Sequence, residues 1–346
     1  MATIKQVAER AGVSIGTVSH VITGSVPVSK RLRSKVQAAI SELDYYPNHI
    51  ARSLKTSKTR TLGIIVPDMT IPFFPRVIRG AEAATLQRGY SLIAVNSDDN
   101  SAREKELLSL LRSQRVEGIL LVVAAGTAPI TQTSSMEDFG VRLVCLDRIP
   151  EGLHIDSVSV DNFAAADMGV SHLISMGHRN ISIVTGPLAL RNEQERLQGY
   201  RKALRRAGFK LQDKLIWEDN FRPEDVAALC RERLSNSRER PAAIFSTNGP
   251  TGLGVLRALR DCRLKTPGDI GFVTFDELTV DDLFTPSVTV VVQPAYEIGF
   301  RAAEILIQRI EGYRGGPITA RLPAKLEIRK SSSLVRSRVG RFQARE

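Results

Sequence analysis

The sequence has few cysteines and no long apolar run. Its three cysteines are Cys145, Cys230 and Cys262, too few and too scattered for a disulfide framework or a cysteine-rich metal site. No stretch approaches the roughly 18 consecutive apolar residues of a membrane span. The first residues also lack the basic region and apolar run of a secretion signal. We therefore expect a cytoplasmic protein without membrane contact.

The composition is that of an ordinary globular protein. Hydrophobic residues make up 42% of the chain and charged residues 25%, which excludes a collagen-like or wholly disordered chain. At about 150 residues per domain, 346 residues predict two or three domains.

The positive charge is unevenly distributed. The formal net charge is +11, yet residues 1–60 hold ten Lys or Arg against three Asp or Glu, and residues 329–346 hold six against one. The long middle is close to neutral. A basic segment on a neutral body indicates that this segment meets phosphates. For the C-terminal run, we favour a solvated tail.

The first 46 residues predict three short helices. Thr3 and Gln6 have the spacing of a capping box, and an apolar stripe follows at helical spacing. Gly12 interrupts this helix, and Ser14 can cap a second one that ends before Gly24. Ser29 can cap a third helix, whose apolar stripe is Leu32, Val36, Ala39, Ile40 and Leu43. Together the three stripes can close a small core.

The second predicted helix has a small, mostly polar outer face that fits a DNA major groove. Its residues are Ile15, Gly16, Thr17, Ser19 and His20. His20 alone could equally be a solvated surface residue. Residues 12–16 also match the G-x-S-x-G pattern of hydrolases, but that motif needs a strand before it, and here a capped helix precedes it.

A short segment with helical potential follows. Pro47 is predicted to end the third helix, and residues 48–55 can form one or two further turns, too few to persist alone in water. Leu54, between Arg52 and Lys55, offers an apolar wedge with flanking cations, as in minor-groove binders. An ordinary flexible linker is the alternative.

Buried strands then alternate with amphipathic helices, which predicts parallel sheets covered on both faces. The predicted strands are Leu62 to Val66, Ser91 to Val95, Gly118 to Val123, Leu143 to Leu146, Ile181 to Thr185, Ala242 to Phe245, Gly271 to Phe275 and Val288 to Val292. A weak repeat at an offset of 119 residues, which pairs Gly80 with Gly199 and Gly89 with Gly208, indicates two similar lobes. Ligands of such sheets bind at the carboxyl ends of the strands, so we expect a pocket between the lobes.

Aromatic, acidic, amide and arginine side chains follow these strands, which suits a small polyhydroxylated ligand. Paired carboxylates could instead belong to a glycosidase. Gly252 and Gly254 lack the third glycine of a dinucleotide fingerprint, and His172 with His178 does not have a metal spacing. We therefore expect no cofactor and no metal.

Several motifs together resemble the lac-repressor/purine-repressor (LacI/GalR) family over nearly the whole chain. They are Ile4-Lys5-Gln6-Val7-Ala8, Ala11-Gly12-Val13-Ser14, Thr17-Val18-Ser19-His20-Val21-Ile22, Tyr46-Pro47-Asn48, Ala51-Arg52-Ser53-Leu54, Val160-Asp161-Asn162, Gly177-His178-Arg179, Arg196-Leu197-Gln198-Gly199-Tyr200, Phe275-Asp276 and Gln293-Pro294. The resemblance implies a homodimeric repressor on palindromic operator DNA, with hinge helices ordered in the minor groove and an effector, a sugar or sugar derivative, between the lobes.

The resemblance also assigns residues. The DNA contacts are expected at Thr3, Ser14, Ile15, Gly16, Thr17, Ser19, His20, Asn48, Ala51, Arg52, Leu54 and Lys55. The effector contacts are expected at Phe73, Phe74, Arg148, Asp161, Arg191, Arg196, Phe221, Asn248 and Asp276. Two positions depart from the family pattern: Ile71 stands where many members carry Asn, and Asn248 replaces a common Asp. The effector of any one relative therefore cannot be transferred to this chain.

The expected architecture is α/β, with an N-terminal all-α helix-turn-helix domain before a two-lobed core like that of periplasmic binding proteins. We expect the helix-turn-helix domain at 1–46, a hinge helix and linker at 47–61, an effector-binding and dimerisation core at 62–330, and a basic tail at 331–346. The function expected is that of an effector-controlled regulator of transcription, and not an enzyme. A plain solute-binding protein is the alternative, which the basic head argues against.

Overall fold

The computed structural model describes residues 2–24, 26–46, 58–126, 141–150, 154–278 and 285–333. The chain divides into two compact units, Met1–Thr59 and Arg60–Glu346. Among the helices of these described ranges, none combines the length and the apolar character of a membrane span.

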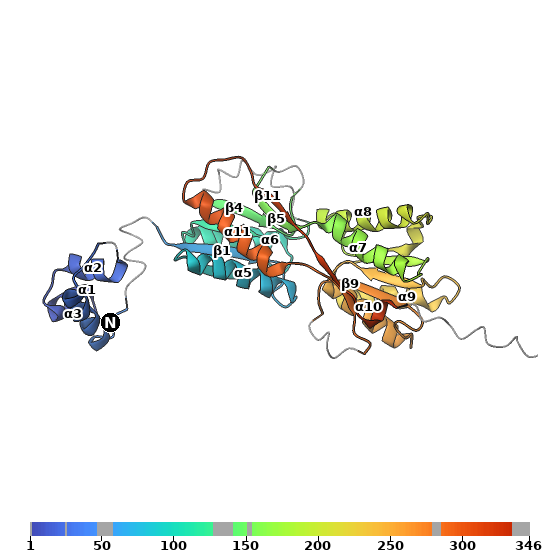
Figure 1. The fold of residues 1–346 in the computed structure, drawn as a ribbon, viewed down its shortest axis with the longest axis horizontal. Coiled ribbons are helices and arrows are strands. Elements are labelled where there is room, and N and C mark those ends of the chain that lie inside the picture. The colour runs from blue at the N-terminus through green and yellow to red at the C-terminus, as the bar shows by residue number, and fades with distance from the viewer. Residues whose placement is uncertain are drawn as a thin grey trace, which may run out of the picture. The chain divides into compact units, whose positions relative to one another are not determined.

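The first unit contains three helices, α1 (Ile4–Ala11), α2 (Ile15–Thr23) and α3 (Lys30–Glu42) (Figure 1). The predicted caps are confirmed. Thr3 and Gln6 form a capping box on α1, while the side chains of Ser14 and Ser29 accept from the third residue of α2 and α3. The helices enclose a small apolar core. Its buried members are Val7, Ala8, Ala11, Val18, Val36 and Ala39.

Two predictions for α3 were wrong. The helix ends at Glu42, before Pro47, because Asp44 turns into the left-handed region at φ 45° and the Tyr45 N–H bonds back to the Ile40 carbonyl. Tyr45 can then pack against the core. Leu32, expected on the buried stripe, lies at the exposed start of α3 and retains 37% of its accessible surface.

The second unit contains two six-stranded sheets, each in its own lobe (Figure 1). The first sheet has the order β11-β5-β4-β3-β1-β2 and is parallel throughout. Its strands are β1 (Thr61–Val66), β2 (Ser91–Asn96), β3 (Gly118–Leu121), β4 (Arg142–Leu146), β5 (Ser157–Val160) and β11 (Thr319–Leu322). Its helices are α5 (Phe73–Gln87), α6 (Ser101–Ser113) and α11 (Ala295–Ile310). We call this lobe 1.

The second sheet, in lobe 2, has the order β12-β10-β9-β8-β6-β7. Only its edge strand β12 runs antiparallel to its neighbour. The strands are β6 (Ile181–Thr185), β7 (Ile216–Glu218), β8 (Ala243–Ser246), β9 (Gly271–Phe275), β10 (Thr289–Val292) and β12 (Lys325–Glu327). The helices are α7 (Asn162–Ser175), α8 (Arg191–Arg206), α9 (Pro223–Ser235) and α10 (Gly249–Asp261). The chain passes between the lobes after β5, after β10 and after β11.

All eight predicted strands are present, with bounds that differ by up to two residues. Four strands were missed: β5, β7, β11 and β12. Each has only three or four residues, and the Ser-Val alternation of β5 does not reveal that all four of its residues are buried.

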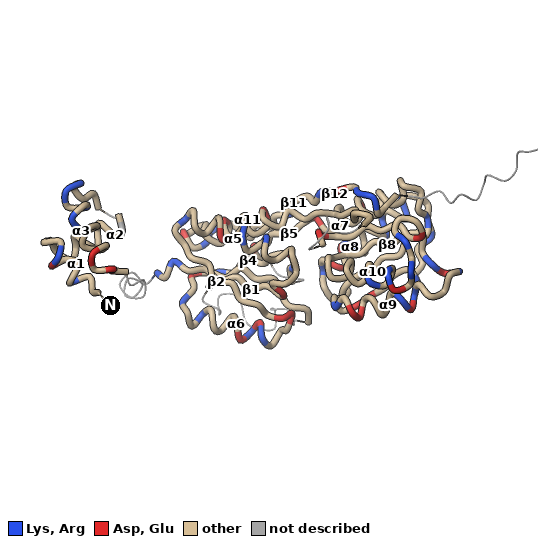
Figure 2. Tube along the Cα trace, turned by 90° about the horizontal axis from the view of Figure 1, so that it is seen from below, with Lys and Arg blue, Asp and Glu red and all other residues tan. Residues whose placement is uncertain are grey.

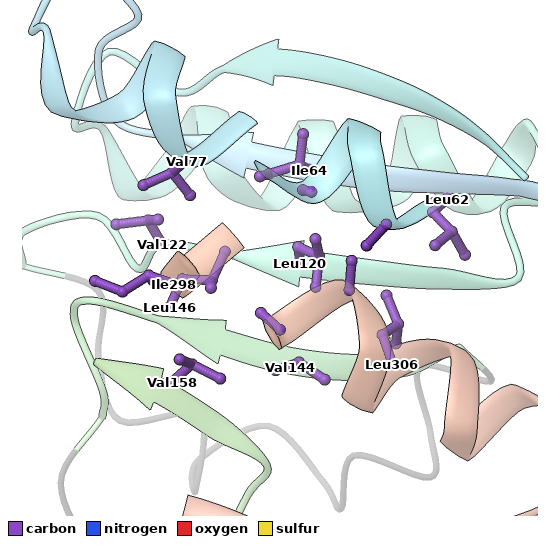
Figure 3. Close-up of a cluster of buried hydrophobic side chains, with 14 of the residues drawn as sticks. Leu62, Ile64, Val77, Leu120, Val122, Val144, Leu146, Val158, Ile298 and Leu306 are labelled. Atoms are coloured by element: carbon purple, nitrogen blue, oxygen red, sulfur yellow. The ribbon is translucent and has the colours of Figure 1, made fainter. Parts of the chain in front are cut away.

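The lobes are built alike around their helix pairs. In lobe 1, α5 and α11 pack over a core that includes Ile64, Leu120 and Leu306 (Figure 3). A Cβ at Gly80 would collide with the backbone of Tyr296 in α11. In lobe 2, a Cβ at Gly199 of α8 would likewise meet the backbone of Phe163 in α7. The repeat seen in the sequence thus marks equivalent close helix contacts.

Candidate effector cavity and nucleic-acid interface

A cavity of about 700 Å³ lies between lobe 1 and lobe 2. Its wall consists mainly of residues that follow the carboxyl ends of the parallel strands, where open α/β sheets bind ligands. Lobe 1 contributes segments after β1 to β4, and lobe 2 contributes segments after β6 to β10. The pocket expected between the lobes is therefore present.

Seven of the nine predicted effector residues line this cavity: Phe73, Phe74, Arg148, Arg196, Phe221, Asn248 and Asp276. The other two do not belong to the described wall. Asp161 caps α7, where its carboxylate accepts from the Ala164 N–H at 3.0 Å. Arg191 begins α8 and pairs with Glu195 one turn later, at 3.1 Å.

Arg196 is buried, with 2% of its surface exposed. Its guanidinium donates to the side chain of Asn162 at 2.8 Å and to the Thr247 carbonyl at 2.6 Å. It also lies over the Phe275 ring, 4.1 Å from the ring centroid, which is a cation–π geometry. These contacts fix the guanidinium in the wall of lobe 2.

Glu193 is a wall residue that the sequence analysis missed. Its fully buried carboxylate accepts from the Thr185 and Thr247 hydroxyls and from the Gly186 N–H, and it pairs with Arg196 at 3.1 Å. Its spacing of three residues before Arg196 on one helix face was a usable signal. The carboxylate joins the ends of β6 and β8 to the arginine.

Arg148 anchors the lobe 1 side. Its guanidinium pairs with the Asp99 carboxylate and donates to the Val123 carbonyl at 3.3 Å. It also lies 5.3 Å from the centroid of the Phe221 ring in lobe 2. A second contact between the lobes is the ion pair of Arg76 in α5 with Glu277.

Backbone strain is concentrated at the cavity. Five residues of its wall have positive φ angles without being glycine: Asp98, Asp99, Asp147, Phe221 and Asp276. Such conformations are uncommon for side chains with a Cβ and persist where the surrounding structure enforces them. They are typical of functional sites.

Two buried carboxyls in the wall have altered acidity. Burial raises the pKa of Asp276 to about 7, against the opposing influence of nearby Arg196 and the hydrogen bonds from the Gln293 amide. Burial likewise raises the pKa of Asp147, although Arg196 and Arg148 favour its charged form. At neutral pH Asp276 can therefore exchange a proton more easily than an exposed aspartate.

The two departures from the family pattern also lie in the wall. Ile71 packs against the lobe 1 core and presents an apolar surface. Asn248 caps α10, and its side-chain oxygen accepts from the Thr251 N–H at 2.9 Å. Its oxygen is therefore already engaged by the protein.

The predicted DNA contacts of the first unit differ in exposure. Of the predicted contacts in α2, Ile15, Gly16 and His20 are exposed, while Thr17 and Ser19 are half-buried. Thr3 and Ser14 are exposed caps. Lys and Arg residues gather in the first turns of α3 (Figure 2). The five predicted contacts of the hinge lie outside the described residues: Asn48, Ala51, Arg52, Leu54 and Lys55.

Comparison with known proteins identifies the family. A model of the bacterial regulatory proteins of the lacI family matches residues 3–48, and a periplasmic binding protein-like domain matches residues 170–332. The ribose operon repressor of Escherichia coli strain K12 is 36% identical over 310 residues, which are 90% of this chain and 93% of that protein. The chain belongs to the lacI family of bacterial regulatory proteins. The resemblance inferred from the motifs is confirmed.

Solved structures support the fold of this lacI-family chain. The transcriptional regulator CelR in complex with cellobiose has 32% identity and a TM-score of 0.72, over 96% of this chain and 100% of that one. The lac repressor dimer bound to operator and the anti-inducer ONPF has 25% identity and a TM-score of 0.81, over 96% and 99%. The α/β class with a helix-turn-helix head is thereby confirmed.

Proposed function

We propose that this lacI-family chain is a transcriptional repressor whose affinity for operator DNA is set by a sugar or sugar derivative in the cavity between its lobes. One observation carries the proposal: the same chain combines a capped α2 that exposes part of its surface with a cavity, in a separate unit, that lies between two lobes and is lined by buried charged side chains. The sugar-bound and operator-bound relatives support both halves of it.

The DNA contacts belong to the first unit in this proposal. The small residues of α2 enter the major groove, and Ile15, which is 48% exposed, can contact a thymine methyl group. Two protomers then bind the halves of a palindromic operator. Residues 48–55 order in the minor groove between them, with Leu54 as the wedge.

The effector acts through the two lobes. A ligand that closes the lobes alters the dimer interface and the separation of the two hinges. It changes the affinity for DNA because it binds one of these two states of the repressor, closed or open, more tightly than the other. Such couplings are typically about 1 to 3 kcal/mol and can have either sign. We propose a binding role without turnover, since Glu193 and Asp276, two buried wall carboxyls, already hold hydrogen bonds from the protein.

The test measures DNA binding of the full chain at several salt concentrations, with and without a panel of sugars. Because phosphate contacts release counterions, binding should weaken steeply as salt rises, whereas a solute receptor has no such dependence. At least one sugar should shift operator affinity by roughly tenfold. A chain that ignores genomic fragments at low salt, with every sugar and without, is not a repressor.

The hinge has its own test. Amide hydrogen exchange over residues 48–55 should slow when specific operator is added, because the segment is too short to stay helical alone. Equal exchange with and without operator would remove the hinge from the mechanism.

A further inference from the structure

Three buried oxygens in the cavity wall have no hydrogen-bond donor among the described residues. They are Asp147 Oδ1, Asn192 Oδ1 and Gln293 Oε1, which we call the orphan oxygens. These side chains are 7%, 5% and 6% exposed. Arg196 Nη2 is 3.9 Å from Asp147 Oδ1, which is too long for a hydrogen bond. A buried acceptor without a partner is costly, so the wall favours a ligand that brings several O–H donors.

The charge of the wall is one-sided. Seven carboxyl side chains line the cavity: Asp68, Asp98, Asp99, Asp147, Glu193, Asp276 and Glu277. Three guanidinium groups face them, from Arg148, Arg196 and Arg222.

The arginines leave little positive charge for an anion. Arg148 is paired with Asp99, and Arg196 with Glu193. Arg222 is exposed, so water screens its charge. Asp98 and Glu277 are likewise paired, with arginines outside the wall. The excess of negative charge that an anionic ligand meets therefore comes from Asp68, Asp147 and Asp276, to the extent that each is ionised.

We propose that the cavity selects uncharged, hydroxyl-rich sugars and rejects their phosphate esters. This inference rests on the proposed function and narrows its effector class. Each sugar hydroxyl can donate to one of the three orphan oxygens and accept from an arginine in the same site. A phosphate monoester replaces one of these hydroxyl donors with a group that carries about −1.5 to −2 charges and mainly acceptor oxygens. The ester therefore has one donor fewer for the orphan oxygens and is repelled by the ionised carboxyls.

Titration calorimetry on the full chain tests this with matched pairs: ribose and ribose 5-phosphate, glucose and glucose 6-phosphate, cellobiose and cellobiose 6-phosphate. At least one free sugar should bind, and its ester should bind about 100-fold more weakly, the result expected when a desolvated like charge opposes binding. An ester that binds as tightly as its parent sugar overturns the proposal. So does a panel in which no sugar binds in either form.

The sugar selectivity of the cavity and the regulatory function of the chain can each be excluded without the other. If a free sugar binds, its ester does not, and operator affinity stays unchanged, the selectivity stands and the proposed regulatory function fails. If an ester binds and alters operator affinity, the regulatory function stands and the selectivity fails.

Variants test the charge argument directly. Asp99→Asn leaves the Arg148 guanidinium without its carboxylate partner. The ratio of the affinity for the free sugar to the affinity for its ester should therefore fall about tenfold. Asp213→Asn serves as control, because Asp213 is exposed and outside the wall. An unchanged preference in Asp99→Asn overturns the charge argument.

A second pair tests the orphan oxygens. Asn192→Leu should weaken binding of the free sugar about tenfold, the usual cost of losing one acceptor for a ligand hydroxyl. Asn236→Leu, at an exposed position of the same lobe, should leave that affinity unchanged. Unaltered sugar binding in Asn192→Leu removes the orphan acceptors from the argument.

Discussion

At the scale of single residues, Asp276 links the cavity to pH. Its pKa is raised from an ordinary 3.8 to about 7 by burial, so the folded chain holds a proton there that the unfolded chain has released. The stability that this proton provides is complete below about pH 4 and is lost as pH rises through 7. Asp276→Asn has no ionisable group at this position. Its free energy of unfolding should therefore rise relative to that of the parent, by about 2 to 3 kcal/mol, as the pH is raised from 5 to 8.

Urea unfolding of the parent and Asp276→Asn at a series of pH values measures this difference. The exposed Asp213→Asn change should follow the parent at every pH. Parallel curves for the parent and Asp276→Asn would show that the folded pKa of Asp276 is not raised.

The sequence indicated most of the cavity residues but not what holds them. Phe73, Arg148 and Arg196 were found because they match motifs or follow predicted strands. Glu193 and Asn192 were missed since their importance depends on burial, and burial results from the packing of β6, β8 and α8. In contrast, Asp161 and Arg191 matched the family pattern, yet the protein uses one as a helix cap and the other in a surface ion pair.

At the scale of elements, the tight contact of α5 with α11 depends on two glycines. Gly80 of α5 approaches the backbone of Tyr296 in α11, and Gly299 of α11 approaches the backbone of Val77 in α5. Neither glycine has room for a Cβ. Gly80→Ala should therefore force the helices apart and lower the free energy of unfolding by about 2 kcal/mol.

Urea midpoints provide the measurement for that change. Gly316→Ala is its control, because a Cβ there meets open space. If both variants unfold at the midpoint of the parent, the close contact of the two helices contributes nothing to stability.

The cap of α2 allows a second prediction at this scale. Ser14 accepts from the Thr17 N–H at 3.1 Å, so Ser14→Ala should destabilise the helix by about 1 kcal/mol. Amide hydrogen exchange within α2 should become roughly fivefold faster, as that free energy implies. Ser41→Ala on α3 is exposed and caps no helix, and it should leave the α2 rates unchanged. Equal rates in the two variants would contradict the cap.

Local signals explain which elements could be predicted. The caps at Thr3, Ser14 and Ser29 lie next to the donors they satisfy, so a few residues of sequence contain the whole interaction. The strands β5 and β7 are short, and β7 pairs only at a sheet edge. Their formation depends on neighbours far away in the chain, which no local pattern reveals.

At the scale of the whole molecule, the proposed DNA-binding surface and the proposed effector cavity belong to separate units. The first unit has its own apolar core, and Arg196 lies wholly within the second. A change at Arg196 should therefore alter the response to effector without altering the DNA surface itself. The sequence predicts a head domain and a two-lobed core, but it does not describe how a signal passes between them.

Arg196→Lys tests this separation, because it keeps the positive charge but cannot reproduce the planar set of donors to Asn162 and Thr247. We expect effector affinity to fall at least about tenfold, while operator affinity without effector stays within about twofold. Calorimetry and DNA-binding titrations on one preparation measure both. Arg206→Lys changes an exposed arginine of the same helix and should leave both affinities as in the parent. Parent-like effector binding in Arg196→Lys would exclude this guanidinium from the site, and a joint loss of both affinities would show that the two units do not act separately.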